Sequence, residues 1–165
     1  MTLEKIPPGA SVFIDANIFI YHFVGQSDDC SRFIQRIEER EIKGIVGTHI
    51  VAEIIHRMMM LEALQSGLIT SGSPSQKVRK QRKLIGNLNI FASQGRQLLA
   101  LPLEIPPLTT SLLQEGITTA TKHHLLMNDA LIIALMREKN ITYLASADRD
   151  FEEIPGIKLY RPKDI

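Results

Sequence analysis

The sequence predicts an α/β domain in which helices cover both faces of a largely parallel β-sheet. Short apolar stretches of strand character alternate with longer stretches whose apolar residues recur at helical spacing. The chain has 165 residues, 44% of them hydrophobic and 22% charged, which are ordinary values for a globular domain. We expect a single domain over residues 1–165, because a chain of this length buries roughly two thirds of the surface that it exposes when unfolded.

The first part of the chain predicts a strand, two helices and a second strand. Residues 11–15 (SVFID) form a short apolar strand, and a helix begins at or beside Asn17. The next helix is predicted over residues 28–43, with Asp28 as its cap. Residues 44–48 (GIVGT) have the character of a second strand. This order is typical of the start of a parallel α/β sheet.

A long helix follows the second strand, and a basic segment follows the helix. Thr48 is predicted to cap this helix and Gly67 to end it. A stretch rich in turn residues then leads into a further helix, predicted over residues 76–92. We interpret residues 66–95 as a basic, helical excursion from the domain. Its cations are Lys77, Arg79, Lys80, Arg82 and Lys83.

The last part of the chain predicts two more helices between segments of strand character. Residues 96–103 have strand character, and residues 107–124 are mostly helical. The apolar spacing predicts a helix over residues 128–140 and a strand over residues 141–148. Residues 156–162 predict a last edge strand, because the proline at its end cannot donate to a neighbouring strand.

Four carboxylates lie at or near the ends of predicted strands and the starts of predicted helices. Asp15 and Asp148 each follow a strand, and the carboxyl ends of parallel strands share the edge of a sheet at which ligands bind. Asp129 lies near the start of a helix, where backbone N–H groups favour an anion. Glu53 lies inside the helix that begins at Thr48. These four carboxylates can converge on one site.

Convergence of carboxylates requires a counter-ion. Two carboxylates 4 Å apart repel each other by about 4 kcal/mol at an effective dielectric constant of 20. Oxygen ligands of this hard type favour Mg²⁺ or Mn²⁺, which also bind phosphate oxygens and lower the pKa of a bound water. The expected cofactor is therefore Mg²⁺ or Mn²⁺, and the expected reaction is hydrolysis of a phosphodiester bond.

Each of these residues also has a purely structural interpretation. Asp15 can cap the helix that follows it. Glu53 precedes Arg57 by four residues, a spacing typical of an exposed ion pair on a helix. Asp148 and Asp150 can form a polar turn. The basic run can be a solvated helix face, or it can bind RNA phosphates.

Four motifs over most of the chain resemble those of the PIN-domain nucleases, and among them the VapC-type toxins. FIDANIFIY resembles the opening strand of that family, with its metal-binding Asp and an Asn two residues later, and THIVAEIIHR resembles the helix that supplies the second acidic residue. LLMNDALIIALM and YLASADRDF resemble the third and fourth motifs. The resemblance implies catalytic and metal-binding roles for Asp15, Glu53, Asp129 and Asp148, and supporting roles for Asn17 and Ser146, with Asp150 as a further candidate.

The resemblance also implies a fold, an activity and partners. The implied fold is a three-layer α/β/α sandwich with a mostly parallel central sheet. The implied activity is Mg²⁺- or Mn²⁺-dependent endonucleolytic cleavage of RNA, by a homodimer that a cognate antitoxin protein inhibits. The excursion at residues 66–95 is longer than in compact toxins of this type, so the sequence leaves the substrate and the toxin assignment open.

The apolar runs and the single cysteine indicate where in the cell the protein is expected. The sequence has no apolar run of about 18 residues and no signal-peptide pattern, and its single cysteine, Cys30, fits a reducing compartment, so we expect a cytoplasmic protein without a membrane anchor. Two alternatives remain open at this stage. One is a Mg²⁺-dependent phosphatase or phosphotransferase with Asp15 as nucleophile. The other is a catalytically silent PIN scaffold that binds RNA or protein.

Overall fold

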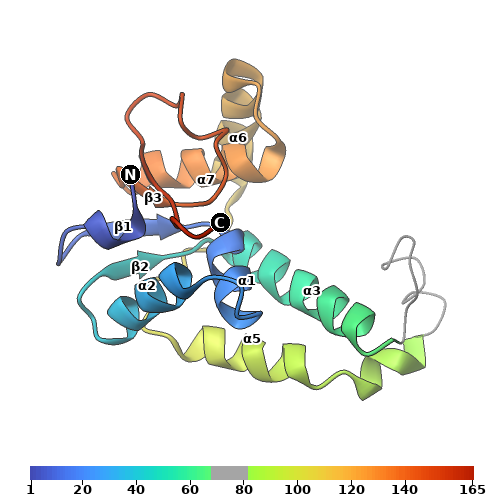
Figure 1. Cartoon of the computed structure of the whole chain (residues 1–165). Helices are drawn as coiled ribbons and strands as arrows, with labels where there is room; N and C mark the ends of the chain where they lie inside the picture. Colours follow the sequence, from blue (N-terminus) through green and yellow to red (C-terminus); the bar gives the residue numbers. More distant parts are fainter. Residues whose placement is uncertain (68–81) are drawn as a thin grey trace. The chain divides into compact units, whose positions relative to one another are not determined.

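The computed structural model describes residues 1–67 and 82–165 (Figure 1). The chain divides into two compact units, one of Met1–Val51 with Pro102–Ile165 and the other of Ala52–Leu101. All the strands of the described chain belong to the first unit. The excursion predicted over residues 66–95 falls within the range of the second unit.

The first unit contains a four-stranded parallel sheet. Its strands are β1 (Ser11–Ile14), β2 (Lys43–Ile45), β3 (Tyr143–Ala145) and β4 (Lys158–Tyr160), in the spatial order β2-β1-β3-β4. The two central strands are apolar and almost fully buried, as expected for strands that are covered on both faces. In the register of this sheet Ile14 lies beside Ala145, so the residues that follow β1 and β3 begin next to each other.

Helices cover the sheet on two sides. In Figure 1, α6 (Thr110–His123) and α7 (Met127–Glu138) lie above β1, whereas α1 (Ala16–Phe23) and α2 (Asp28–Glu38) lie below it. The chain crosses from β1 to β2 in one direction along the sheet and from β2 back past β1 to β3 in the other, so right-handed crossovers place their helices on opposite faces. Residues 130–136 of α7 are all buried. The predicted α/β/α fold with a parallel sheet is confirmed.

The boundaries of α2 differ from those that the sequence predicted. The cap of α2 is Ser27 and not Asp28, because the Ser27 hydroxyl accepts a hydrogen bond of 3.0 Å from the backbone N–H of Cys30. Asp28 is instead the first residue of the helix, where a carboxylate interacts favourably with the positive end of the helix dipole. The helix ends at Glu38, well before residue 43, and Arg40 beyond it has a positive φ of 59°. Ser and Asp are both common caps, so local sequence did not distinguish them.

The long helix α3 (Thr48–Gln65) crosses the boundary between the two units. Thr48, predicted as its cap, is its first residue, and the Thr48 hydroxyl accepts a hydrogen bond of 3.0 Å from the backbone N–H of Leu108. The helix ends two residues before Gly67, which has a positive φ of 69°. The predicted helix end at this glycine is confirmed, since a residue in this conformation is typical of helix C-termini.

The second unit consists of the later part of α3, a 3₁₀ helix η2 (Arg82–Asn87) and α5 (Ile90–Ala100). The described part of the helix predicted over residues 76–92 is helical but divided into η2 and the start of α5. The strand predicted over residues 96–103 is wrong because residues 96–100 belong to α5. An apolar cluster joins η2 and the start of α5 to α3. The cluster consists of the buried Ala63 and Leu88 with the partly buried Met59, Met60, Ile85 and Phe91 around them.

A buried carboxylate fixes the start of α5. Glu62 of α3 accepts hydrogen bonds of 2.8, 3.0 and 2.8 Å from the backbone N–H groups of Asn89, Ile90 and Phe91. These are N–H groups at a helix start, which have no partner within their own helix. Burial alone would raise the pKa of Glu62, but the three backbone donors outweigh it and lower this pKa below its usual value. The helix boundary at residue 90 therefore depends on a residue of another helix.

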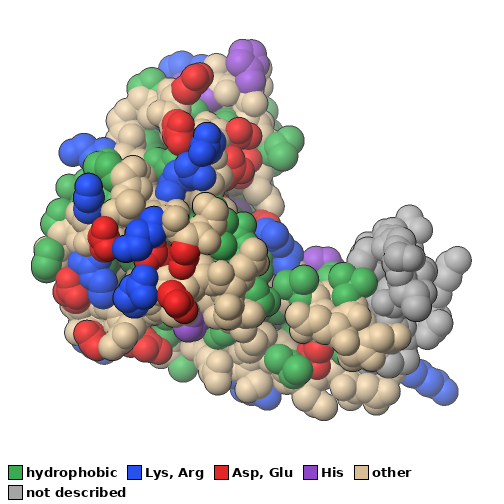
Figure 2. Space-filling model, in the orientation of Figure 1, with side chains coloured by type: hydrophobic (Ala, Val, Ile, Leu, Met, Phe, Trp, Pro, Cys, Tyr) green, Lys and Arg blue, Asp and Glu red, His purple; other side chains and the backbone are tan. Residues whose placement is uncertain are grey.

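Charged side chains of both signs are interspersed on one face of the molecule (Figure 2). On the face drawn in Figure 2, Lys and Arg side chains lie among Asp and Glu side chains around η1 (Leu3–Lys5) and α2, in agreement with a net charge of +1. Of the predicted RNA-binding residues, Lys83 is exposed, and Lys77, Arg79 and Lys80 lie outside the described residues, as does the Arg82 side chain. Among residues 1–67 and 82–165, no helix is both long enough and apolar enough to span a membrane.

Candidate active site

Asp15 lies at the end of β1 and caps α1. Its Oδ1 atom accepts a hydrogen bond of 2.6 Å from the backbone N–H of Ala16, and its backbone is extended. The residue is 9% exposed. Burial of a carboxylate is costly unless hydrogen bonds compensate for the lost water. The capping interpretation is therefore confirmed, but it accounts for one oxygen of the carboxylate and not for the other.

Two side chains donate hydrogen bonds to the second oxygen of Asp15. The Ser146 hydroxyl donates to Oδ2 at 2.6 Å, and the side-chain amide of Asn17 donates to the same atom. The Asn17 amide also donates to the Ser146 Oγ at 3.1 Å. Ser146 has no exposed surface. The three residues thus form a closed triangle of hydrogen bonds at the carboxyl edge of the sheet.

The loop after β3 is attached to this triangle. The backbone N–H of Ala147 donates to Oδ1 of Asn17 at 3.0 Å, and the backbone N–H of Asp148 donates to the Ser146 Oγ at 3.0 Å. Ser146 therefore uses its one donor and both of its acceptor sites. Beyond the triangle, Oδ1 of Asp148 accepts a hydrogen bond of 2.9 Å from the backbone N–H of Asp150. This is the polar turn that the sequence suggested, and the side chains of Asp148 and Asp150 are both exposed.

Asp129 lies in the first turn of α7 and is half-buried. Its helix has Leu126 as N-cap residue, which offers no side-chain acceptor, so Asp129 supplies negative charge to this helix start. The end of α7 leads directly into β3, at the amino edge of the sheet. The start of α7 consequently points toward the carboxyl edge, where Asp15 and the loop of Asp148 lie.

The four carboxylates predicted to bind a metal ion are divided between the two units, with Asp15, Asp129 and Asp148 in the first unit. Nowhere in residues 1–67 and 82–165 do three or more His, Cys, Asp or Glu side chains form a group that could hold a metal ion. Glu53 belongs to the second unit, and one of its carboxylate oxygens lies 3.5 Å from Nη1 of Arg57, the ion pair expected from their spacing. The carboxylates of Asp15, Asp129 and Asp148 fit a hard divalent cation by donor type. The convergence of all four carboxylates stays a prediction.

One residue of the site has no signal in the sequence. Arg161 follows β4, and its Nε donates a hydrogen bond of 3.1 Å to the backbone carbonyl of Ala147. Its Nη1 atom lies 3.7 Å from a carboxylate oxygen of Glu152. An arginine after an edge strand is unremarkable in a single sequence. It is the sheet order, with β4 beside β3, that brings this guanidinium to the loop of Asp148.

Several solved structures share this fold. VapBC2 from Rickettsia felis, bound to a DNA fragment from its promoter, superposes with a TM-score of 0.61 at 15% identity, over 93% of this chain and 99% of the other. VapC20 from Mycobacterium tuberculosis, a toxin that cleaves the sarcin–ricin loop, gives 0.59 at 14% identity, over 86% and 92%. A toxin–antitoxin complex from Klebsiella pneumoniae gives 0.52 at 16% identity, over 89% and 95%. At these identities the likeness concerns the fold.

Sequence comparison identifies the family. None of the curated proteins compared with the chain matches it significantly. The sequence profile of the PIN domain matches residues 12–157, a range that begins in β1 and ends just before β4. This range contains Asp15, Asn17, Glu53, Asp129 and Ser146 to Asp150. The resemblance noted in the sequence motifs is thus confirmed, and the chain belongs to the PIN-domain family.

Proposed function

We propose that the chain is a Mg²⁺- or Mn²⁺-dependent endoribonuclease that hydrolyses phosphodiester bonds of RNA. The observation that carries this proposal is the carboxylate of Asp15, buried at the carboxyl edge of the sheet with its second oxygen held by Ser146 and Asn17. A helix cap needs one carboxylate oxygen, so the second set of hydrogen bonds needs another explanation. Orientation of a carboxylate toward a bound cation provides one, as is usual for metal ligands.

The proposed metal ligands are Asp15, Asp129 and Asp148, with Glu53 from α3. A bound Mg²⁺ or Mn²⁺ supplies a water of lowered pKa and neutralises charge on the leaving oxygen. Ser146 and Asn17 hold the Asp15 carboxylate in one orientation, because each donates to Oδ2. The Asp148 side chain is exposed on its turn and accessible to a large substrate, and Asp150 fixes that turn through its backbone N–H.

We further propose that the chain is the toxin of a VapBC-type toxin–antitoxin pair, a cytoplasmic homodimer that an antitoxin protein inhibits. Support comes from the relatives with the same fold, which include VapBC2 and a toxin–antitoxin complex. Co-expression with the product of an adjacent small gene tests the pairing. A stable complex in size-exclusion chromatography that suppresses RNA cleavage is the expected result, and light scattering of the free chain tests the homodimer.

The basic run is proposed to bind RNA phosphates. Each phosphate contact adds affinity that decreases with salt concentration. Replacement of Lys77, Arg79, Lys80, Arg82 and Lys83 by Ala should therefore weaken RNA binding and flatten its salt dependence. An unchanged dependence of affinity on salt would identify the run as a solvated surface.

The nuclease proposal is tested by cleavage of a labelled panel of structured RNAs by the purified chain, in Mg²⁺, in Mn²⁺ and in EDTA. We expect cleavage that EDTA abolishes and that is lost in Asp15→Asn and in Asp129→Asn. A matched control is Asp28→Asn, since Asp28 is an exposed acidic residue of the same unit on α2. Cleavage that survives in Asp15→Asn would contradict the proposal.

A catalytically silent PIN scaffold is the second candidate. The observation that favours it is that residues 1–67 and 82–165 contain no group of three acidic, His or Cys side chains suited to a metal ion. Isothermal titration with Mn²⁺ separates the two candidates when it is combined with the RNA panel. Binding of RNA with no cleavage of any RNA, in the presence of Mn²⁺, would favour the scaffold.

A further inference from the structure

The peptide unit between Ala147 and Asp148 is held at both of its polar ends. Its carbonyl oxygen, of Ala147, accepts a hydrogen bond of 3.1 Å from Nε of Arg161. Its N–H, of Asp148, donates a hydrogen bond of 3.0 Å to Oγ of Ser146. The preceding N–H, of Ala147, donates 3.0 Å to the Asn17 side chain. Two successive peptide planes therefore lead into Asp148 with fixed orientations, and Arg161 fixes the second of them.

Arg161 is itself firmly anchored through its backbone. Its N–H donates a hydrogen bond of 2.8 Å to the carbonyl of Met1, and its carbonyl accepts a hydrogen bond of 3.1 Å from the N–H of Leu3. Its side chain is 25% exposed, with Nη1 at 3.7 Å from Glu152. The guanidinium thus projects from a fixed backbone position toward the loop of Asp148.

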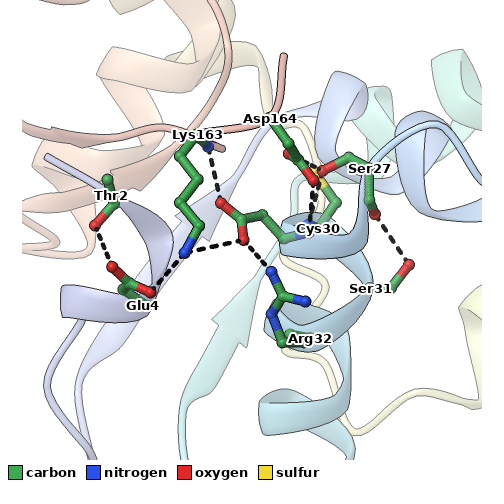
Figure 3. A network of polar contacts seen from close by, with 9 residues as sticks. Thr2, Glu4, Ser27, Cys30, Ser31, Arg32, Lys163 and Asp164 are labelled. Atoms are coloured by element: carbon green, nitrogen blue, oxygen red, sulfur yellow. Dashed lines mark hydrogen bonds and ion pairs between the residues drawn. The ribbon is translucent and has the colours of Figure 1, made fainter.

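The residues after Arg161 attach the chain to α2, as Figure 3 shows. Asp164 accepts hydrogen bonds of 2.6 Å from the Ser27 hydroxyl and 3.1 Å from the backbone N–H of Asp29. The backbone N–H of Lys163 donates 2.8 Å to the Asp29 carboxylate, and the Lys163 ammonium lies 3.0 Å from Glu4. We call these contacts of Lys163 and Asp164 the C-terminal clamp. Arg161 is therefore held between β4 on one side and the C-terminal clamp on the other.

We propose that Arg161 is a positioning residue that sets the orientation of Asp148 through the Ala147 carbonyl. The proposal rests on the nuclease function proposed above, in which Asp148 binds the metal. Loss of the Nε donor leaves the Ala147–Asp148 peptide plane held at its N–H end alone, and the plane can then rotate. A carboxylate attached to a rotating plane loses the fixed geometry on which catalysis depends.

A second arginine of the same unit provides a matched control. Arg36 donates hydrogen bonds to the carbonyls of Leu3 and Ile6 at 3.2 and 2.6 Å, and its Nε donates to Glu41 at 3.0 Å. It resembles Arg161 in burial and in binding both carbonyl and carboxylate, but its partners lie in the N-terminal segment and after α2. Loss of Arg36 should therefore affect stability while it leaves the bond from Nε of Arg161 to the Ala147 carbonyl in place.

The experiment compares Arg161→Met, Arg161→Lys and Arg36→Met with the wild-type chain. The first measurement is hydrogen exchange of the Asp148 amide by ¹⁵N NMR, without metal or RNA, so that it does not depend on activity. We expect exchange about tenfold faster in both Arg161 variants and unchanged in Arg36→Met. The second measurement is RNA cleavage, for which we expect kcat to fall about tenfold or more in both Arg161 variants with KM within about twofold.

Two results would overturn the positioning role. One is an Asp148 amide that exchanges at the wild-type rate in Arg161→Met. The other is full kcat in Arg161→Lys together with fast exchange, because it would mean that the positive charge matters and not the bond to Ala147. If the wild-type chain cleaves no RNA, the nuclease proposal fails, whereas the exchange measurement still decides whether Arg161 holds the peptide plane.

Discussion

The Ser146 hydroxyl donates a 2.6 Å hydrogen bond to Oδ2 of Asp15, across 131 positions of sequence. Both residues are buried, and each immediately follows a central strand. The bond exists because β1 and β3 are parallel neighbours whose last residues, Ile14 and Ala145, are paired in register. It joins the first and fourth motifs of the chain into one site, and the first prediction concerns it.

Replacement of Ser146 by Ala removes one donor to Asp15 and the acceptor for two further N–H groups. We expect a lower kcat for RNA cleavage, by about tenfold or more, because the carboxylate loses its fixed orientation. The free energy of unfolding should fall by about 1–3 kcal/mol, since Asp15 and Asn17 each lose one hydrogen bond and the Asp148 N–H loses its acceptor. Urea denaturation and single-turnover kinetics measure the two effects. Wild-type kcat in Ser146→Ala would exclude an orienting role.

Glu62→Gln should destabilise the chain by about 1–3 kcal/mol at pH 7, because the anion that binds three N–H groups at the start of α5 becomes neutral. Urea denaturation gives this value, and Glu115→Gln, at an exposed position of α6, is the control.

The stabilisation that Glu62 provides should depend on pH. Because the pKa of folded Glu62 lies below its usual 4.5, the folded state binds fewer protons than the unfolded state. Its contribution to stability is thus fully present above about pH 4.5 and is lost as the pH falls through the lower, folded pKa. The stability difference between wild type and Glu62→Gln should shrink below pH 4.5. A difference that stays constant down to pH 3 would contradict this assignment.

Cys30 should be almost unreactive in the folded chain. It is fully buried on α2, and burial raises the pKa of its thiol to about 11, so very little thiolate forms at pH 8. Because it is the single cysteine of the chain, its labelling by a thiol reagent reports one site. We expect slow labelling in buffer and rapid labelling in urea. Equally fast labelling in both solutions would mean that α2 opens readily.

The C-terminal clamp predicts that two adjacent acidic residues differ in importance. Asp29 is 6% exposed, accepts a hydrogen bond from the backbone of Lys163 and pairs with Arg32, whereas Asp28 is exposed. Asp29→Asn should therefore lower the free energy of unfolding by about 1–3 kcal/mol more than Asp28→Asn, because its partners lose a buried charge. Thermal and urea denaturation of the two variants test this difference, and equal values would mean that the clamp adds little.

Most elements of the first unit could be predicted, because their signals are local. The apolar runs of β1 and β3 and the helical spacing of α7 each depend on a few neighbouring residues. The second unit was predicted less well. Residues 96–100 have strand character in sequence but belong to α5, where Leu98 is fully buried and Gly95 lies against the side chain of Ile55 of α3. Packing against another helix overrode local preference at this position.

The caps illustrate the same limit at the scale of single residues. Ser27 and Asp28 are both good caps, and the choice of Ser27 coincides with its bond to Asp164, close to the end of the described chain. The start of α5 has no side-chain cap from Asn89, the residue before it, because Glu62 of α3 satisfies its N–H groups. Neither partner can be found by examining the residues around the helix start.

The sequence by itself determined the parallel α/β class, the position of Asp15 at a strand end, and the family resemblance of the four motifs. These depend on residue type and on spacing along the chain. Tertiary structure alone decided that Ser146 and Asn17 share one oxygen of Asp15, and that Arg161 holds the carbonyl before Asp148. The physical reason is that sheet order and register, which sum many distant contacts, place these groups within hydrogen-bonding distance.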